Sequence, residues 1–253
     1  MNLLDVIAQR DRDGQALGRH SLMLGSLILM LVALPLLEWS PGRNLRFPIL
    51  FGLVLFAAIW VNRTQHWLLW AAVAIGLGSV AGNAIAFVTA SSAIRIGADL
   101  IGLVLLVFTT FVILSSVAKE QRVDLDTVVG GICVYLLIGV CFATLYRLLV
   151  DLVPGAFFLH GEPLAATGDE SSSLPARLLY FSFITLTTTG IGDITPRAEL
   201  AQMLTAGESV IGQLYVAIFI ARLMGLHVEA GRVQADLDER PVPTSAARGD
   251  EST

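Results

Sequence analysis

The sequence predicts an all-α membrane protein with six transmembrane helices, and with a re-entrant helix and loop between the fifth and the sixth. Of its 253 residues, 55% are hydrophobic and 15% are charged, whereas about a quarter of the residues in a soluble domain are charged. Six apolar runs approach or exceed the roughly 20 residues that a bilayer-spanning helix needs. These runs are Ser21 to Glu38, Phe47 to Val61, Trp67 to Val88, Ile96 to Ala118, Thr127 to Val150 and Glu199 to Val228.

The first four runs lie within residues 21–123 and form one predicted four-helix domain. The second run is the shortest, but Arg46 and Arg63 flank it, and basic side chains at helix ends extend to the membrane interface. Trp60 is suited to the same interface. Residues 1–20 are polar and lack a small-residue cleavage site, so we expect a cytoplasmic N-terminal segment rather than a cleaved signal peptide.

Residues 124–228 form the second predicted domain, which holds the fifth and sixth runs. Between them, Pro175 to Leu186 is too short to cross a bilayer but long enough for about three helical turns. Ser173 or Leu174 takes the cap position, and Pro175 suits the first turn. Non-helical backbone at membrane depth is tolerated only where protein buries it or where it lines a watery cavity. The loop after Leu186 is therefore predicted to line such a cavity.

An even number of spans places both termini on one side of the membrane. Lys and Arg residues that flank the spans are more frequent on the terminal side, which predicts cytoplasmic termini in a multi-pass protein of the cell (inner) membrane. Residues 229–253 are rich in charge and contain Pro241 and Pro243. We expect them to form a frayed helix end and then a disordered tail, with no soluble ligand domain.

Residues 187–196 read TTTGIGDITP. Glycine permits backbone conformations in which successive carbonyls point the same way, and a row of carbonyl oxygens can replace the water around a metal cation. The string from Thr188 to Asp193 resembles the selectivity filter of pore-loop potassium channels, whose usual form is TVGYGD. With its flanking helices, this resemblance covers Asp126 to Val228 as an outer helix, pore helix, filter and inner helix.

The resemblance implies a role for each filter residue. The Thr188 hydroxyl and four backbone carbonyls would bind potassium, the permeant ion, with no other cofactor. Gly192 would complete the outer turn, Asp193 would tether the filter from behind, and Pro196 would begin the return to the inner helix. A single loop cannot surround a cation, so a homotetramer in membrane lipid is expected. The four carbonyls are those of Thr188, Thr189, Gly190 and Ile191.

Two filter positions depart from the family pattern. Thr189 replaces the usual valine and carries a hydroxyl that needs a partner, and Ile191 replaces the usual tyrosine and lacks its phenolic hydroxyl. A weakly selective monovalent cation channel therefore remains an alternative to a potassium-selective one. A non-conducting regulatory subunit is a second alternative.

The inner helix contains two glycines and one acid. Gly207 is expected to serve close helix packing, whereas Gly212 stands where the family's hinge usually lies, and hinge and packing remain equal alternatives there. Residues at four-residue spacing from Gly212 share its face and form either a hydrophobic gate or a lipid-facing or helix-packing surface. They are Val216, Ile220 and Met224.

Glu208 is the one acid well inside the inner helix. Carboxylates within a membrane are expensive and usually functional. We expect Glu208 to support the filter from behind, through a buried network with pore-helix hydroxyls such as Ser182 or Thr185.

The first four helices occupy the position of a voltage sensor but lack its charges. The fourth run offers Arg95 and no further basic residue until Lys119. Moving one charge is worth only about 2.3 kcal/mol per 100 mV, so strong voltage gating is not expected. Arg95 and Asp99 are four residues apart and are predicted to pair near the outer end. What these helices sense is left open.

Other function classes find little support in the sequence. The net charge of −5 gives no indication of nucleic-acid binding. The glycine string lacks the βαβ context of a nucleotide-binding loop. Cys133 and Cys141 are interpreted as small buried apolar residues. The four histidines are scattered, which does not favour an enzyme; they are His20, His66, His160 and His227.

Overall fold

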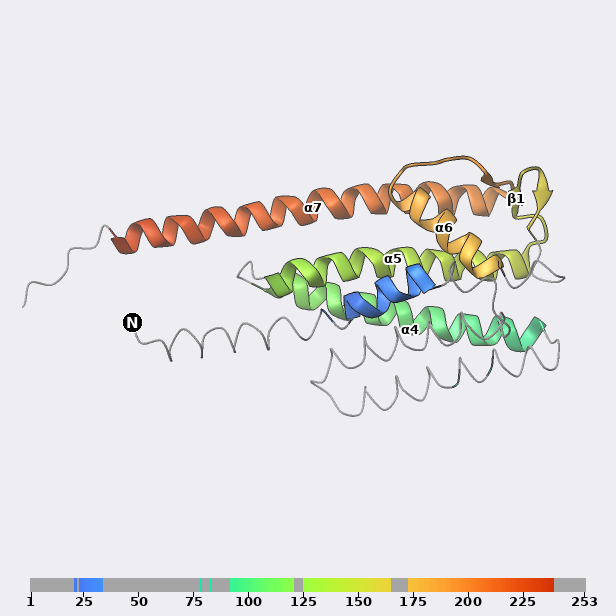
Figure 1. Cartoon of the computed structure of the whole chain (residues 1–253), viewed down its shortest axis with the longest axis horizontal. Helices are drawn as coiled ribbons and strands as arrows, with labels where there is room; N and C mark the ends of the chain where they lie inside the picture. The colour runs from blue at the N-terminus through green and yellow to red at the C-terminus, as the bar shows by residue number, and fades with distance from the viewer. Residues whose placement is uncertain are drawn as a thin grey trace, which may run out of the picture.

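The computed structural model describes residues 21, 23–33, 78, 82, 92–120, 125–164 and 173–238. Long helices dominate this part of the chain, with a short helix and a small sheet at one end (Figure 1). In chain order the labelled elements are α4 (Ser92–Lys119), α5 (Leu125–Leu152), β1 (Phe157–Leu159), β2 (Glu162–Pro163), α6 (Leu174–Leu186), β3 (Ile194–Pro196) and α7 (Glu199–Asp238).

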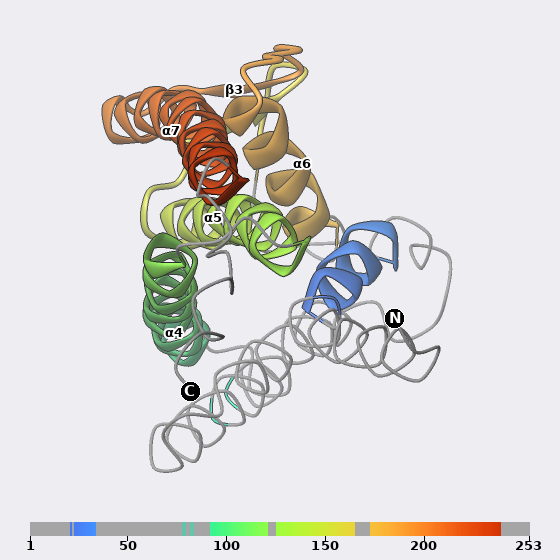
Figure 2. The ribbon, with the colours of Figure 1, turned by 90° about the vertical axis from the view of Figure 1, so that its left-hand side faces the viewer.

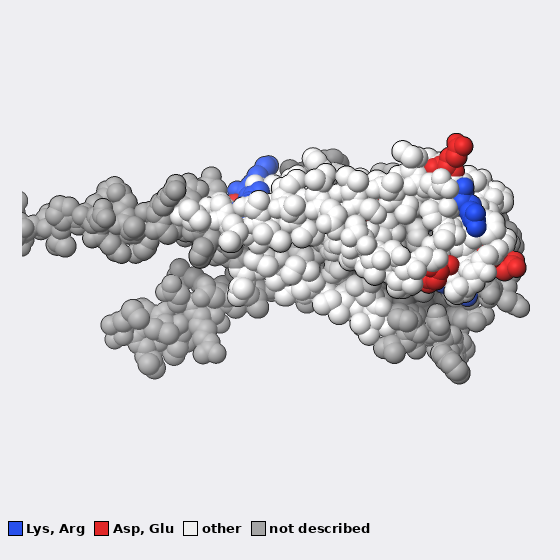
Figure 3. Space-filling view, turned by 90° about the horizontal axis from the view of Figure 1, so that it is seen from above, with Lys and Arg blue, Asp and Glu red and all other residues white. Residues whose placement is uncertain are grey.

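Within the described residues, three helices are long and apolar enough to cross a membrane. They are Ala93–Lys119 of α4, Leu125–Leu152 of α5 and Glu199–Leu226 of α7, which confirms helices for the fourth, fifth and sixth predicted runs. In the view over α7, the described charged side chains gather near two ends and leave an uncharged surface between them (Figure 3). These features support a membrane protein.

The six-span count itself stays a prediction. The second predicted run, nearly all of the third, residues 1–20 and the tail from residue 239 lie outside the described residues. The described part of the first run contains the apolar helix Met23–Ala33, which is shorter than a membrane span. The helix α7 continues to Asp238, past the predicted boundary at Val228. No proline, which would remove a helix hydrogen bond, occurs after Val228 until Pro241.

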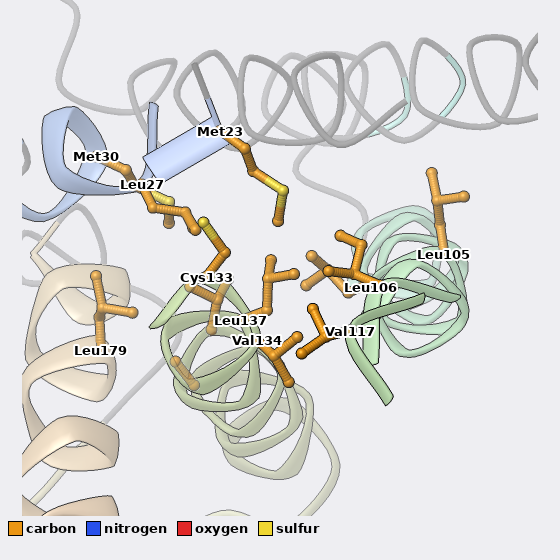
Figure 4. Packing of buried hydrophobic residues seen from close by; sticks show 13 residues of the cluster. Met23, Leu27, Met30, Leu105, Leu106, Val117, Cys133, Val134, Leu137 and Leu179 are labelled. Carbon is orange, nitrogen blue, oxygen red and sulfur yellow. The ribbon is translucent and has the colours of Figure 1, made fainter. Parts of the chain in front are cut away.

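The helix α5 is central to the described part of the chain. It packs against α4 on one side and against α6 and α7 on the other (Figure 2). Apolar side chains of Met23–Ala33, α4, α5 and α6 meet in one buried cluster, in which Cys133 and Leu137 of α5 lie between Leu27 and Leu106 (Figure 4). The helix α5 is therefore packed against the preceding helix α4 of its own chain.

Two ion pairs join α4 to α5. Arg95 pairs with Asp151 at 2.5 Å, and Arg147 pairs with Asp99 at 3.1 Å. The ion-pair partner of Arg95 is thus Asp151 of the antiparallel helix α5, while the predicted partner Asp99 acts on Arg95 through its nearby charge. Asp99 is only 4% exposed, and a buried charge requires a partner. The two pairs fix the register of α4 against α5.

The described fold is not purely helical, because β2, β1 and β3 form an antiparallel sheet in that order. His160 and Gly161 connect β1 to β2, with φ of 50° and 90°, as in the tight hairpin turns that need positive φ at both central residues. β1 also pairs with β3, with Phe158 opposite Thr195. These strands are two or three residues long and carry no alternating pattern, so the sequence did not indicate them. The sheet anchors the backbone that follows residues 187–193.

Candidate functional site

The short helix α6 leads directly into the glycine string. It begins at Leu174 with Pro175 in its first turn, as predicted, although Ser173 makes no side-chain capping bond. It ends at Leu186, and the Thr187 N–H donates to the Phe183 carbonyl at 3.0 Å. Residues 187–192, which follow, are exposed in the single chain. The last carbonyls of α6 are thus placed to accept hydrogen bonds from the loop.

Positive φ occurs at every second residue of this loop. Thr188, Gly190 and Gly192 have φ of 57°, 54° and 85°, while Thr189 and Ile191 are not in that region. Alternation of left-handed and other residues turns successive peptide groups to the same side. Thr188 adopts a conformation that costs a non-glycine residue roughly 1–2 kcal/mol, and such strain is typical of functional sites.

Hydrogen bonds fix the direction of the loop's first peptide groups. The N–H groups of Thr188, Thr189 and Gly190 donate to carbonyls near the end of α6, at 2.8, 2.8 and 3.1 Å. In a trans peptide, the carbonyl of the preceding residue points opposite to the N–H. The carbonyls of residues 187–189 therefore all point away from α6. Exposed carbonyls in a row are suitable ligands for a partly dehydrated cation.

The threonine hydroxyls of the loop have defined partners. Thr187 Oγ1 donates to the Phe183 carbonyl at 2.7 Å and lies 2.9 Å from Thr189 Oγ1. Because Thr187 has only one hydroxyl proton, Thr189 is the donor in the second contact. The hydroxyl at the usual valine position therefore has the partner that it needs.

Asp193 lies at the other end of the loop, beside α6 and the hairpin. The Tyr180 side chain of α6 lies close enough to the Asp193 carboxylate to feel its charge, and the Asp193 carbonyl accepts from the His160 N–H at 3.2 Å. The bond from His160 holds the backbone of Asp193 to the hairpin, and the support of the loop by the Asp193 side chain stays a prediction. Sequence reasoning singled out Asp193 but missed Tyr180 and His160, whose contribution depends on the hairpin.

Glu208 is fully buried, at 0% exposure, between three helices. Its Oε2 accepts from the Tyr146 hydroxyl of α5, and its Oε1 lies beside Ser182 Oγ of α6, both at 2.5 Å. Ser182 was expected as a partner. Tyr146 was missed, and the only signal for it was a hydroxyl-bearing residue within the apolar fifth run. Thr185 instead contributes its carbonyl, which lies 3.2 Å from Ser209 Oγ; the single Ser209 proton is shared between this carbonyl and that of Thr205, also at 3.2 Å.

A count of protons indicates the state of the Glu208 network. Ser182 Oγ is also 2.7 Å from the Gly139 carbonyl, which can only accept. Because Ser182 has one proton, it cannot donate to both Gly139 and Glu208. A protonated Glu208 donates to Ser182, Ser182 donates to Gly139, and Tyr146 donates to Glu208, so that every proton is used once. We infer that Glu208 is a neutral acid, since an isolated buried carboxylate is costly.

The two glycines Gly207 and Gly212 of α7 have different surroundings. A Cβ at Gly212 would overlap the Leu186 carbonyl oxygen at the end of α6, so Gly212 permits that close approach. A Cβ at Gly207 would meet nothing within 4 Å in the described chain, so a packing role for Gly207 stays a prediction. Gly212 therefore has the packing role, and α7 continues as a helix through it. A hinge at Gly212 stays a prediction.

The remaining residues of the predicted gate lie farther along α7. Val216, Ile220 and Met224 are 41%, 55% and 64% exposed in the single chain. The described helices of the same chain do not cover this stripe. Its role as a gate stays a prediction, as do the ion-binding roles of Thr188, Thr189, Gly190, Ile191 and Gly192.

One comparison with known proteins bears on this site. Residues 134–228 match a family model described as an ion channel. No curated protein and no solved structure matches the chain. The matched residues begin within α5 and include α6, the loop and most of α7, so they contain the whole site described above. The match supports an ion channel of the pore-loop kind.

Proposed function

We propose that this chain is the subunit of a homotetrameric channel that conducts potassium passively across the cell (inner) membrane. The observation that carries the proposal is the direction of the three carbonyls of residues 187–189, which all point away from α6 in an exposed part of the chain. Positive φ at Gly190 and Gly192 continues the same alternation. Oxygen ligands in this arrangement can replace water around an ion.

Assembly of several copies follows from the geometry of the loop. One chain offers its carbonyls from one side only, whereas an ion that loses its water needs oxygens around it. Closed symmetry about the ion provides them. The helix α7 also exposes large apolar side chains, which are available to neighbouring copies or to lipid; they include Val210, Leu214 and Ile218.

The α4 helix supports gating that does not depend strongly on voltage. Arg95 is its one arginine, and it is held by Asp151 of α5. A voltage sensor needs several charges that move through the field, at about 2.3 kcal/mol per charge and 100 mV. The proposed channel therefore opens without a strong voltage requirement.

A weakly selective monovalent cation channel is the second candidate. It is favoured by Ile191, whose side chain is 62% exposed in the single chain and has no hydroxyl to brace the filter. A non-conducting regulatory subunit is tested by the same experiment as the proposal.

The experiment measures potassium flux into liposomes that contain the purified chain, together with the mass of the assembly. A tetramer that carries potassium is the expected result. Gly190→Ala is the matched variant, because φ at Gly190 is 54° and a side chain is strained there; we expect it to assemble but to lose selective flux. Absence of flux from a stable tetramer would favour the non-conducting subunit.

A further inference from the structure

Gln213 of α7 contacts the base of the filter loop. Its Nε2 donates to Thr188 Oγ1 at 3.0 Å. Two features of α7 bring this side chain into place. The preceding Gly212 lies against the Leu186 carbonyl, where a Cβ would not fit. One turn earlier, Ser209 Oγ lies 3.2 Å from the Thr185 carbonyl. The face of α7 that carries residues 209 and 213 therefore lies against the end of α6 and the start of the loop.

The Thr188 hydroxyl is oriented by its other hydrogen bond. It donates its proton to the Thr187 carbonyl at 2.7 Å, so both of its lone pairs are free to accept. Gln213 takes one of them. One lone pair is then left for a cation.

We propose that Gln213 is a positioning residue that weakens cation binding at the innermost site of the filter. This inference rests on the proposed channel function. The Gln213 N–H occupies a lone pair of Thr188 and directs the positive end of its dipole towards the position of the ion. Conduction requires an ion to bind firmly enough to lose water but weakly enough to leave. Gln213 adjusts the ion affinity of the innermost site and leaves the ion sites nearer the outer end of the filter unchanged.

The test uses barium, a divalent cation of nearly the size of potassium, on the reconstituted full chain. Barium applied from the inner side reaches the Thr188 site before the outer filter. Gln213→Met keeps the length of the side chain but removes the hydrogen-bond donor. The hydrogen bond from the Thr188 hydroxyl to the Thr187 carbonyl is kept. We expect the inner-side barium affinity to rise by about three- to tenfold, the change that loss of one hydrogen-bond donor implies. Barium affinity from the outer side and the ratio of potassium to sodium permeability should not change.

The control variant is Gln202→Met on the same helix. Gln202 Nε2 contacts the carbonyls of Pro196 and Arg197 at 3.4 Å, at the opposite end of the loop, so inner-side barium block should be as in the wild type. Thr188→Val provides a double-mutant cycle, because without the hydroxyl the change at Gln213 should have no further effect.

The outcomes separate this inference from the proposed function. If the wild type conducts and Gln213→Met leaves the inner-side barium affinity unchanged, or changes it equally in Thr188→Val, the role of Gln213 is refuted alone. If the wild type carries no current, calorimetry of barium binding to the purified tetramer replaces block as the measurement. A wild type that neither conducts nor binds barium would overturn both proposals.

Discussion

A neutral Glu208 predicts an unusual order of stability among its variants. Glu208→Gln keeps a donor for Ser182 and an acceptor for Tyr146, which are the two functions that the protonated acid performs. Glu208→Ala removes both. The conservative variant should therefore resemble the wild type, while the truncated variant should be strongly destabilised.

The magnitudes follow from the burial and the contacts. Glu208 is fully buried, so its truncation leaves a cavity and a Tyr146 hydroxyl without an acceptor, at a cost of about 3–5 kcal/mol. Glu208→Gln conserves the volume of the side chain and should cost no more than about 1 kcal/mol. Tyr146→Phe removes one hydrogen bond without a large cavity and should cost about 1 kcal/mol.

Thermal unfolding of the purified chain in detergent measures this order. We expect Glu208→Ala to lower the Tm by roughly 10 °C, and Glu208→Gln to leave it close to the wild-type value. Glu199→Gln is the control, because Glu199 is an exposed acid in the first turn of the same helix. If Glu208→Gln destabilises the protein as much as Glu208→Ala, Glu208 is ionised, accepts both hydrogen bonds and is not the neutral acid inferred from its contacts.

Three further predictions concern α4 and α7. Conductance should change little with voltage, and a conductance–voltage curve as steep as several gating charges per tetramer would contradict the account of α4. Ile220→Asn should hydrate the predicted constriction and raise basal conductance with unchanged ion preference. Ile220 would instead lie against lipid or a helix if the conductance did not change and if cysteines placed along the stripe were protected from water-soluble thiol reagents. Arg95→Gln should cost about 3 kcal/mol in thermal unfolding because it leaves the Asp151 carboxylate unpaired, and the double exchange Arg95→Asp with Asp151→Arg should restore part of the loss; equal stability of all three proteins would show that the pair is dispensable.

Local patterns in the sequence were sufficient to predict the short helix α6 and the loop that follows it. Pro175 and the short apolar stretch mark α6, and the glycines mark the positions with positive φ. Thr188 also has positive φ, which the sequence did not predict because it depends on the hydrogen bond from the Thr188 N–H to the end of α6.

Features that depend on how helices face one another could not be predicted in this way. Arg95 binds Asp151, which is 56 residues away, because α5 runs antiparallel beside α4. The sequence offers Asp99 as a nearer partner but contains no information on that register. The choice between Gly207 and Gly212 likewise depends on the rotation of α7 about its own axis, which the helical period alone does not determine.

The central claim is selective conduction of potassium through the loop of residues 187–193, and the reversal potential tests it most directly. The purified chain is reconstituted in a planar bilayer with potassium on one side and sodium on the other. We expect the reversal potential of the wild type to lie close to the potassium equilibrium potential. If Gly190→Ala still carries a current, its reversal potential should shift towards zero. A wild-type reversal potential near zero, unchanged when sodium replaces potassium, would contradict selectivity and leave the weakly selective cation channel.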